Sequence, residues 1–171
     1  MSKIIINILR FIILVCIQVF LFKNIVFYGL NTPYLYILFV LLLPFETPNW
    51  LLFLLAFLMG LTIDLFNDTV GLNAAACTIL AFVRVIFISI TVQKDTLEND
   101  LSPNLSTMGF RWFFFYALIL TLTHHFFLLN LEVFKLSEIP TTLSRVILSS
   151  IFTLTLIFIA EILFYSKKQR K

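Results

Sequence analysis

Six runs of mainly apolar residues alternate with short polar segments along the chain. They cover residues 4–22, 33–45, 50–66, 73–93, 110–129 and 142–165. Five of them approach or exceed the roughly 20 residues that an α-helix needs to cross a ~30 Å hydrocarbon layer. None has the alternating pattern of an outer-membrane barrel strand. The pattern predicts an all-α integral membrane protein with about six transmembrane helices in a single polytopic domain, residues 1–171.

The second run is the shortest, because its continuous apolar part covers only residues 34–45. A helix of that length does not span the hydrocarbon layer upright unless neighbouring residues join it or the bilayer thins locally. The alternative is a re-entrant segment, which leaves five spanning helices.

Composition agrees with a membrane protein and excludes a soluble domain. Hydrophobic residues make up 61% of the chain and charged residues 12%, whereas a soluble domain has about 45–50% and about 25%. The net charge of +3 does not indicate nucleic-acid binding, since four of the twelve basic residues lie in the last five positions. A basic tail directly after a membrane helix is typical of a topology signal that also contacts anionic membrane lipid.

The basic residues also predict the orientation of the helices. With six spans the two termini share one side of the membrane, and that side collects seven basic residues against two on the other. Cytoplasmic segments carry the excess of Lys and Arg, so both termini are expected in the cytoplasm. The seven are Lys3, Lys94, Arg111, Lys167, Lys168, Arg170 and Lys171; the two are Lys23 and Lys135.

The stretch 60–76 carries the most informative polar residues. Gly60, Asp64 and Asp68 recur every four residues after Ala56, so they are expected on one face of the third helix. The small pair Ala56 and Gly60 allows close helix approach, and the aspartates should therefore point at protein or a water-filled crevice. Gly71 and Asn73 predict a turn, with Asn73 as the N-cap of the fourth helix.

Three roles for Asp64 and Asp68 follow from this placement. They can cap and lock the turn, because the N-terminus of the fourth helix offers free N–H groups. A carboxylate in or near hydrocarbon is also a functional-site hypothesis in itself, which leaves binding of a ligand, ion or partner, or catalysis.

The spacing Gly60-x-x-x-Asp64-x-x-x-Asp68 matches half of the CDP-alcohol phosphotransferase signature. The other half requires Asp-Gly-x-x-Ala-Arg upstream, where residues 46–51 instead read Glu-Thr-Pro-Asn-Trp-Leu. No serine–histidine–acid set or phosphate loop is present either, so we expect no enzymatic activity and no cofactor.

Other polar side chains within the apolar runs have structural interpretations. Gln18 is expected to bond a neighbouring helix. Arg84 lies about 9 Å from the end of the fourth helix, at ~1.5 Å per residue, and is expected to extend toward the cytoplasm. His124 and His125 lie at a depth similar to that of Asp64, which would allow a hydrogen bond between a histidine and this aspartate across helices. Adjacent histidines such as His124 and His125 point about 100° apart on a helix and have no third ligand, so no metal site is indicated.

With these features in order, the chain resembles the MreD family of bacterial rod shape-determining membrane proteins over nearly its whole length. The shared features are a glutamine in the first helix, a proline opening the second, a Gly-Leu-x-x-Asp block, a glycine turn with small residues, and an arginine late in the fourth helix. They correspond to Gln18, Pro33, Gly60–Asp64, Gly71–Ala76 and Arg84.

The resemblance implies a non-enzymatic scaffold in the bacterial inner membrane, needed for cell shape and lateral peptidoglycan synthesis. Its partner would be MreC, and through MreC also MreB, RodA and a penicillin-binding transpeptidase. The family fold is similar to that of the substrate-binding components of energy-coupling-factor transporters. That similarity leaves a vitamin-binding transporter component as the alternative, with Asp64, Asp68, His124 and His125 lining an outer pocket.

Overall fold

The computed structural model describes residues 3–22, 33–93, 101–133 and 139–169, and every regular element in these ranges is helical. Helix α1 (Lys3–Cys16) continues as a π-helical turn, η1 (Ile17–Phe22). A 3₁₀ turn, η2 (Leu35–Ile37), leads directly into the one-turn helix α2 (Leu38–Leu41). Four long helices follow: α3 (Asn49–Asn67), α4 (Leu72–Thr91), α6 (Leu105–Val133) and α7 (Ile139–Gln169).

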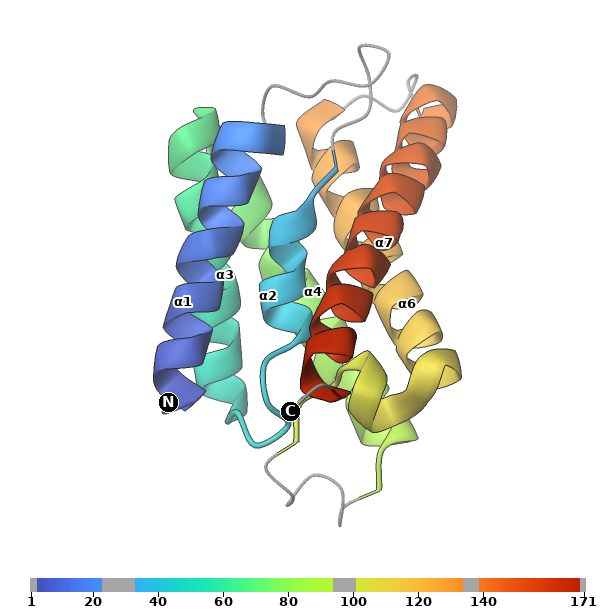
Figure 1. Cartoon of the computed structure of the whole chain (residues 1–171). Helices are drawn as coiled ribbons and strands as arrows, with labels where there is room; N and C mark the ends of the chain where they lie inside the picture. Colours follow the sequence, from blue (N-terminus) through green and yellow to red (C-terminus); the bar gives the residue numbers. More distant parts are fainter. Residues whose placement is uncertain (1–2, 23–32, 94–100, 134–138, 170–171) are drawn as a thin grey trace.

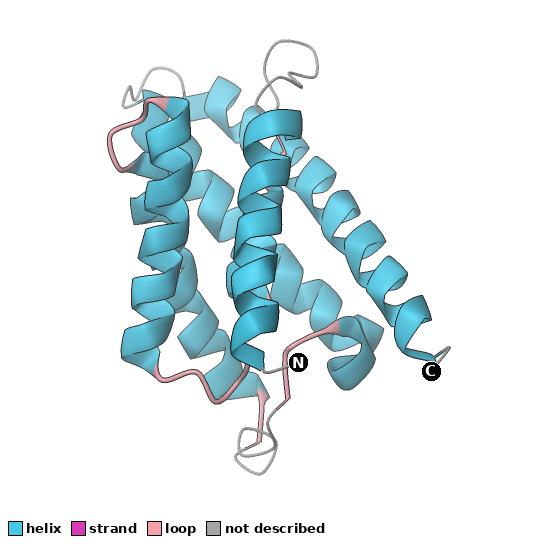
Figure 2. Ribbon diagram, turned by 60° about the vertical axis from the view of Figure 1, so that its left-hand side comes forward, coloured by secondary structure: helices cyan, strands magenta, loops and turns pink. Residues whose placement is uncertain are grey.

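The long helices form a bundle around the short segment η2–α2. Figure 1 shows α2 behind the space between α1 and α7, and α1 begins at the end of the bundle where α7 finishes, as Figure 2 also shows. We call this the terminal end and the opposite one the far end. The short segment contacts α1, α3, α4 and α7. Tyr36, Ile37, Val40 and Leu41 have no exposed surface, so the segment forms the centre of the core.

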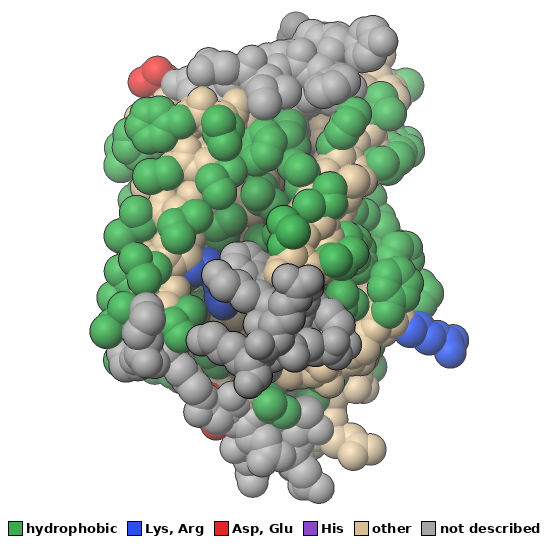
Figure 3. Space-filling view, in the orientation of Figure 1, with side chains coloured by type: hydrophobic (Ala, Val, Ile, Leu, Met, Phe, Trp, Pro, Cys, Tyr) green, Lys and Arg blue, Asp and Glu red, His purple; other side chains and the backbone are tan. Residues whose placement is uncertain are grey.

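Within the described ranges, five helical stretches are long and apolar enough to cross a membrane: 4–22, 49–67, 72–91, 105–133 and 140–163. They confirm an all-α fold with multiple membrane helices. Large apolar side chains cover the outside of these helices, as expected where the surroundings are lipid, and Figure 3 shows them over most of one face.

The expected helix over 33–45 is helical only over residues 35–41. Seven residues extend over about 10 Å even at the α-helical rise of 1.5 Å per residue, and Pro33 and Pro44 stand on either side of them. Non-helical backbone is tolerated at membrane depth where protein surrounds it. The core position of the segment provides this environment.

Helix α6 begins five residues before the expected start at residue 110. Its first turn ends at Gly109, whose φ of +77° and ψ of +163° break the helix. Asn104 caps that turn, because its Oδ1 accepts the N–H groups of Ser106 and Thr107 at 3.0 and 2.9 Å. The apolar pattern missed this turn because it contains polar residues.

Candidate functional site

The carboxylate of Asp64, on the last turn of α3, holds the connection between α3 and α4. It is 2% exposed. Its Oδ1 accepts the backbone N–H of Asn73 at 3.1 Å, and its Oδ2 accepts that of Ala74 at 2.9 Å. The side chains of Asn73 and Thr69 also donate to Oδ1, at 2.9 and 2.5 Å. The first N–H groups of a helix have no partner within it, so α3 supplies the acceptors that α4 lacks.

Two expectations about this turn were wrong. Asp68 does not face inward with Asp64: it is exposed, and its φ of +56° ends the helix before the four-residue spacing reaches it. Asn73 is not the N-cap, because Gly71, with φ +75°, precedes the first helical residue and Asn73 is the second residue of α4. The capping side chain comes from Asp64 instead.

Gly60 explains how α4 comes close enough to Asp64. A Cβ placed on Gly60 would lie 2.5 Å from the Cα of Ala74, well inside van der Waals contact. Ala56, one turn earlier on the same face, is completely buried. The close approach expected from this small pair is confirmed, and it sets the N-terminus of α4 against the last turn of α3.

Asn73 extends the hydrogen bonds of Asp64 to the centre of the bundle. The hydroxyl of Tyr36 donates to Oδ1 of Asn73 at 2.8 Å and lies 2.9 Å from Nε2 of His124 on α6. Because the single hydroxyl hydrogen goes to Asn73, Nε2 of His124 must donate to Tyr36. These four side chains form a buried line, the Asp64–His124 network. The contact of His124 with Asp64 is therefore indirect.

His125 belongs to a second set of bonds, which fixes the opposite tautomer. Its Nδ1 lies 2.8 Å from the carbonyl of Thr121, which only accepts, so Nδ1 donates and Nε2 is the acceptor. Thr153 on α7 accordingly donates its hydroxyl to Nε2 at 3.0 Å and accepts the backbone N–H of Tyr34, also at 3.0 Å. Both histidines thus tie α6 to the start of the short segment.

Gln18 binds the same part of the chain from the other side. It lies in the π-helical turn η1, is 3% exposed, and donates its amide to the carbonyl of Pro33 at 3.0 Å. The partner expected for Gln18 was a neighbouring helix, and it is instead the carbonyl of Pro33, which lies just before η2 and outside any helix. Among the described residues, Oε1 of Gln18 and Nδ1 of His124 are buried acceptors that receive no hydrogen bond.

The expectation that Arg84 extends toward the membrane surface was wrong. Arg84 is 2% exposed, and its Nη2 donates to the carbonyl of Leu43 while its Nε donates to the hydroxyl of Tyr116 at 3.0 Å. Tyr116 in turn donates to the carbonyl of Leu41 at 2.8 Å. The last carbonyls of a helix lack partners and carry its negative dipole end. Arg84 therefore stays inside, because the end of α2 gives it acceptors there.

Arg10 on α1 donates to the remaining carbonyl at the end of α2. Its Nη1 donates to the carbonyl of Leu42 at 3.1 Å and to Oδ1 of Asn7 at 3.3 Å. Three consecutive carbonyls, 41–43, are thus bound by side chains from three different long helices. A segment that cannot complete its own hydrogen bonds is stabilised at membrane depth in this way.

A buried carboxylate also caps the start of α6. Oε2 of Glu161, on α7 and 6% exposed, accepts the backbone N–H of Leu105 at 2.9 Å. The arrangement repeats that of Asp64 and α4, with an acid on one helix serving the N-terminus of another. On the surface, Arg145 of α7 pairs with Glu132 of α6 at 3.7 Å.

Two cavities accompany these polar sets. A recess of about 220 Å³ lies beside the Asp64–His124 network, and we call it the far recess. Neither aspartate of the turn lines it, and neither histidine does. Its lining consists of Gln18, Tyr34, Asn67, Thr69, Leu72, Asn73, Leu128 and Glu132. A larger groove of about 460 Å³ runs between α1, the short segment and α7 and is mostly apolar.

Sequence reasoning missed the two tyrosines that join these sets, Tyr36 and Tyr116. Both are completely buried, and a buried phenolic hydroxyl usually requires a hydrogen-bond partner. Each tyrosine within an apolar run could therefore have been paired in advance with the polar residues Asn73, His124 and Arg84. The identity of the backbone carbonyls 41–43 could not, because it depends on where α2 ends.

The arrangement defines a class of protein: an all-α, multi-pass membrane protein whose buried polar side chains hold helix ends together. Within the described ranges, no three His, Cys, Asp or Glu side chains are grouped so that they could hold a metal ion. Comparison with protein-family models, with curated proteins and with solved structures found no match to the chain. A particular function is therefore inferred from the residues of the chain and their contacts.

Proposed function

We propose that the chain is a non-enzymatic scaffold of the bacterial cell-elongation machinery, similar to MreD, in the inner membrane. It would act with an MreC-like protein, and through it with MreB filaments, RodA and a penicillin-binding transpeptidase. Its role would be in cell shape and lateral cell-wall synthesis.

The observation that carries this proposal is that the residues that resemble the family are engaged in contacts between separate segments of the bundle. The carboxylate of Asp64 accepts hydrogen bonds from the N-terminus of α4, and Gly60 allows that helix to pack closely against α3. Arg84 donates to a carbonyl at the end of α2. Gln18 and Pro33 are joined directly by a hydrogen bond. A set of residues committed to holding helices in place fits a protein whose function is to present a stable surface to partners.

The proposed placement has six passes with both termini in the cytoplasm. The short segment would be the second pass, and the terminal end would face the cytoplasm. The seven-to-two distribution of basic residues supports this orientation. A tag fused to the C-terminus should therefore be protected from protease in intact cells. Digestion of the tag from outside would overturn the orientation without affecting the scaffold role.

A vitamin-binding transporter component is the second candidate, and the far recess favours it, because Gln18 and Asn73 bring polar groups to that surface. The recess of about 220 Å³ is smaller than the ~300–1,000 Å³ of typical small-molecule pockets. Of the acids and histidines that would have recognised a ligand, three are already hydrogen-bonded to other side chains or to backbone, namely Asp64, His124 and His125. The fourth, Asp68, is exposed and does not line the recess. The observations therefore favour the scaffold.

Co-purification from native membranes distinguishes the two candidates. The scaffold proposal expects an MreC-like protein in stoichiometric yield with the tagged chain, and rounded cells when the chain is depleted. Recovery of an ATPase module with a bound vitamin, and no MreC-like partner, would overturn it. Asp64→Asn should lower the yield of the complex while Asp68→Asn, the same change at an exposed site, should not. Equal yields would contradict the central role of Asp64.

A further inference from the structure

The groove between α1 and α7 is apolar along most of its length and polar at one end. Its walls include Leu9 and Ile13 on α1, Ile17 at the start of η1, and Leu35 and Leu38 on the short segment. The α1 wall runs from residue 6 to residue 17, which is about 16 Å at 1.5 Å per residue. Figure 3 shows a hollow between apolar side chains on the upper part of the face between α1 and α7, so the apolar part of the groove opens sideways, where lipid would lie.

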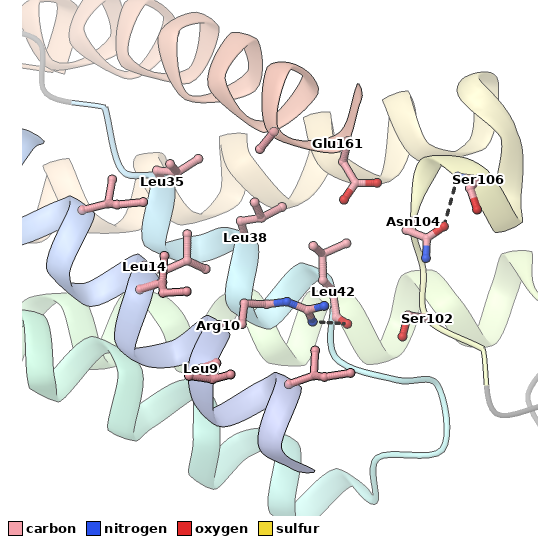
Figure 4. A pocket seen from close by; sticks show the side chains of 14 residues that line it. Leu9, Arg10, Leu14, Leu35, Leu38, Leu42, Ser102, Asn104, Ser106 and Glu161 are labelled. Carbon is pink, nitrogen blue, oxygen red and sulfur yellow. Dashed lines mark hydrogen bonds between the residues drawn. The ribbon is translucent and has the colours of Figure 1, made fainter. Parts of the chain in front are cut away.

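Two opposite charges lie at the polar end. Arg10 projects from α1 toward α2, and Glu161 projects from α7 into the same space, as Figure 4 shows. Ser102, Asn104 and Ser106, at the start of α6, line this part of the groove. The polar end therefore lies toward the terminal end of the bundle, and the apolar walls extend from it toward the membrane interior.

Both charged groups keep hydrogen-bonding capacity for a further partner. Arg10 uses Nη1 for Leu42 and Asn7, and its Nε and Nη2 donate to no other described residue. Glu161 uses Oε2 for the N–H of Leu105, and its Oε1 accepts from no described residue. No ion pair joins the two side chains within the described part of the chain. A cation with free N–H donors and a carboxylate oxygen thus face one space from opposite walls.

We propose that this groove binds one phospholipid whose headgroup carries both a phosphate and a primary ammonium. The phosphate accepts from Nε and Nη2 of Arg10, a planar donor pair suited to phosphate oxygens. The ammonium donates to Oε1 of Glu161, and one acyl chain lies along Leu9, Ile13 and Leu14 toward Ile17. A lipid with this headgroup matches both charges at once, which a headgroup with the phosphate alone, or with no charged group, does not.

The two charged groups favour a lipid over a partner helix. The apolar face of a membrane helix offers no partner to the free donors of Arg10 or to Oε1 of Glu161, whereas a phospholipid headgroup offers one to each. An extended hydrocarbon chain also matches the long apolar part of the groove.

Native mass spectrometry of the delipidated full chain in detergent tests the proposal. The probes are dioleoyl phosphatidylethanolamine, with both charges; phosphatidylglycerol, with the phosphate only; phosphatidylcholine, whose ammonium has no N–H; and diacylglycerol, with neither. We expect phosphatidylethanolamine to bind about tenfold more tightly than phosphatidylglycerol and phosphatidylcholine, since one charge-assisted hydrogen bond is at stake. Diacylglycerol should bind least.

Variants assign the two halves of the headgroup. Glu161→Gln keeps an acceptor for Leu105 and should reduce phosphatidylethanolamine binding to the level of phosphatidylglycerol. Arg10→Gln keeps a donor for Leu42 and should weaken binding of all three phospholipids about tenfold, leaving diacylglycerol unchanged. Arg111→Gln removes an exposed arginine outside the groove and should change nothing. Ile13→Trp narrows the apolar part without touching either charge, so it should weaken all four lipids.

Equal binding of all four lipids, or the same lipid preference in Glu161→Gln as in the wild type, would overturn the proposal. So would unchanged lipid binding in Ile13→Trp combined with loss of a co-purifying membrane protein, because the occupant would then be a helix. If a polar-end variant does not fold, Ile13→Trp still decides whether the apolar part is occupied.

Discussion

Exchanging Asp64 for asparagine, and separately Asp68 for asparagine, measures how much the turn between α3 and α4 depends on one carboxylate. The two substitutions are chemically identical and lie four residues apart. Asp64 accepts four hydrogen bonds at the buried start of α4, whereas Asp68 is exposed. Asparagine tolerates the left-handed conformation of position 68, so the control adds no backbone strain.

The magnitude follows from the donors left behind. Asp64→Asn keeps one acceptor oxygen, but its amide replaces Oδ2 and faces the N–H of Ala74, so one buried donor loses its partner. This costs about 1–3 kcal/mol. Asp64→Ala removes the acceptors for two backbone N–H groups and the amide of Asn73, and because these donors can relax together we expect about 3–5 kcal/mol. Asp68→Asn should stay within about 0.5 kcal/mol of the wild type.

The assay is reversible unfolding of the purified chain from mixed micelles by titration with dodecyl sulfate, followed by far-UV circular dichroism. The free energy of unfolding should fall in the order wild type and Asp68→Asn, then Asp64→Asn, then Asp64→Ala. If Asp64→Asn and Asp68→Asn unfold at the same detergent fraction, the bonds to α4 do not stabilise the fold and the reasoning fails.

Four further substitutions and one double variant test neighbouring contacts by the same titration. Gly60→Ala should destabilise by about 1–3 kcal/mol, because its Cβ overlaps the backbone of α4; stability equal to the wild type would mean that the helices can separate freely. Arg84→Leu leaves the carbonyl of Leu43 unpaired and should cost about 1–3 kcal/mol, whereas an arginine that merely reached the surface would show almost no loss. Tyr36→Phe and His124→Phe should each destabilise the fold by about 1–3 kcal/mol. The double variant should cost less than the sum of the two, because both single changes remove the same hydrogen bond. Strictly additive losses would contradict the network.

Hydropathy was enough to predict the long helices, because a membrane helix needs a continuous apolar run and little else. Four of the five stretches begin and end within a few residues of the expected bounds. It failed at α6, whose first turn, 105–108, is made by Asn104 and ended by Gly109. Capping is local hydrogen bonding, so an apolar run cannot reveal it.

The site was predictable only where one helix determines the geometry. Gly60 and Asp64 share a face because they are four residues apart on one helix, and both are engaged with α4 as that spacing implied. The prediction that Asp68 faces inward was wrong because helix α3 ends one residue before it. The prediction that Arg84 extends to the membrane surface was wrong because its acceptors lie in another segment. Side-chain hydrogen bonds between helices depend on which backbone N–H and C=O groups have no partner within their own helix, and the apolar pattern does not reveal this.

The short segment explains why this chain places so many polar side chains in its core. Seven helical residues leave most of their terminal N–H and C=O groups without partners, and lipid offers none. The segment therefore receives partners from the long helices: Gln18 and Thr153 at its start, Arg84 and Tyr116 at its end. The buried polar residues therefore stabilise a short segment that cannot satisfy its own backbone groups. The turn at Asp64 is one of several places where the long helices are hydrogen-bonded to it. Replacing any of them should loosen the short segment first, and hydrogen exchange should rise earliest at backbone 35–43, before the long helices open.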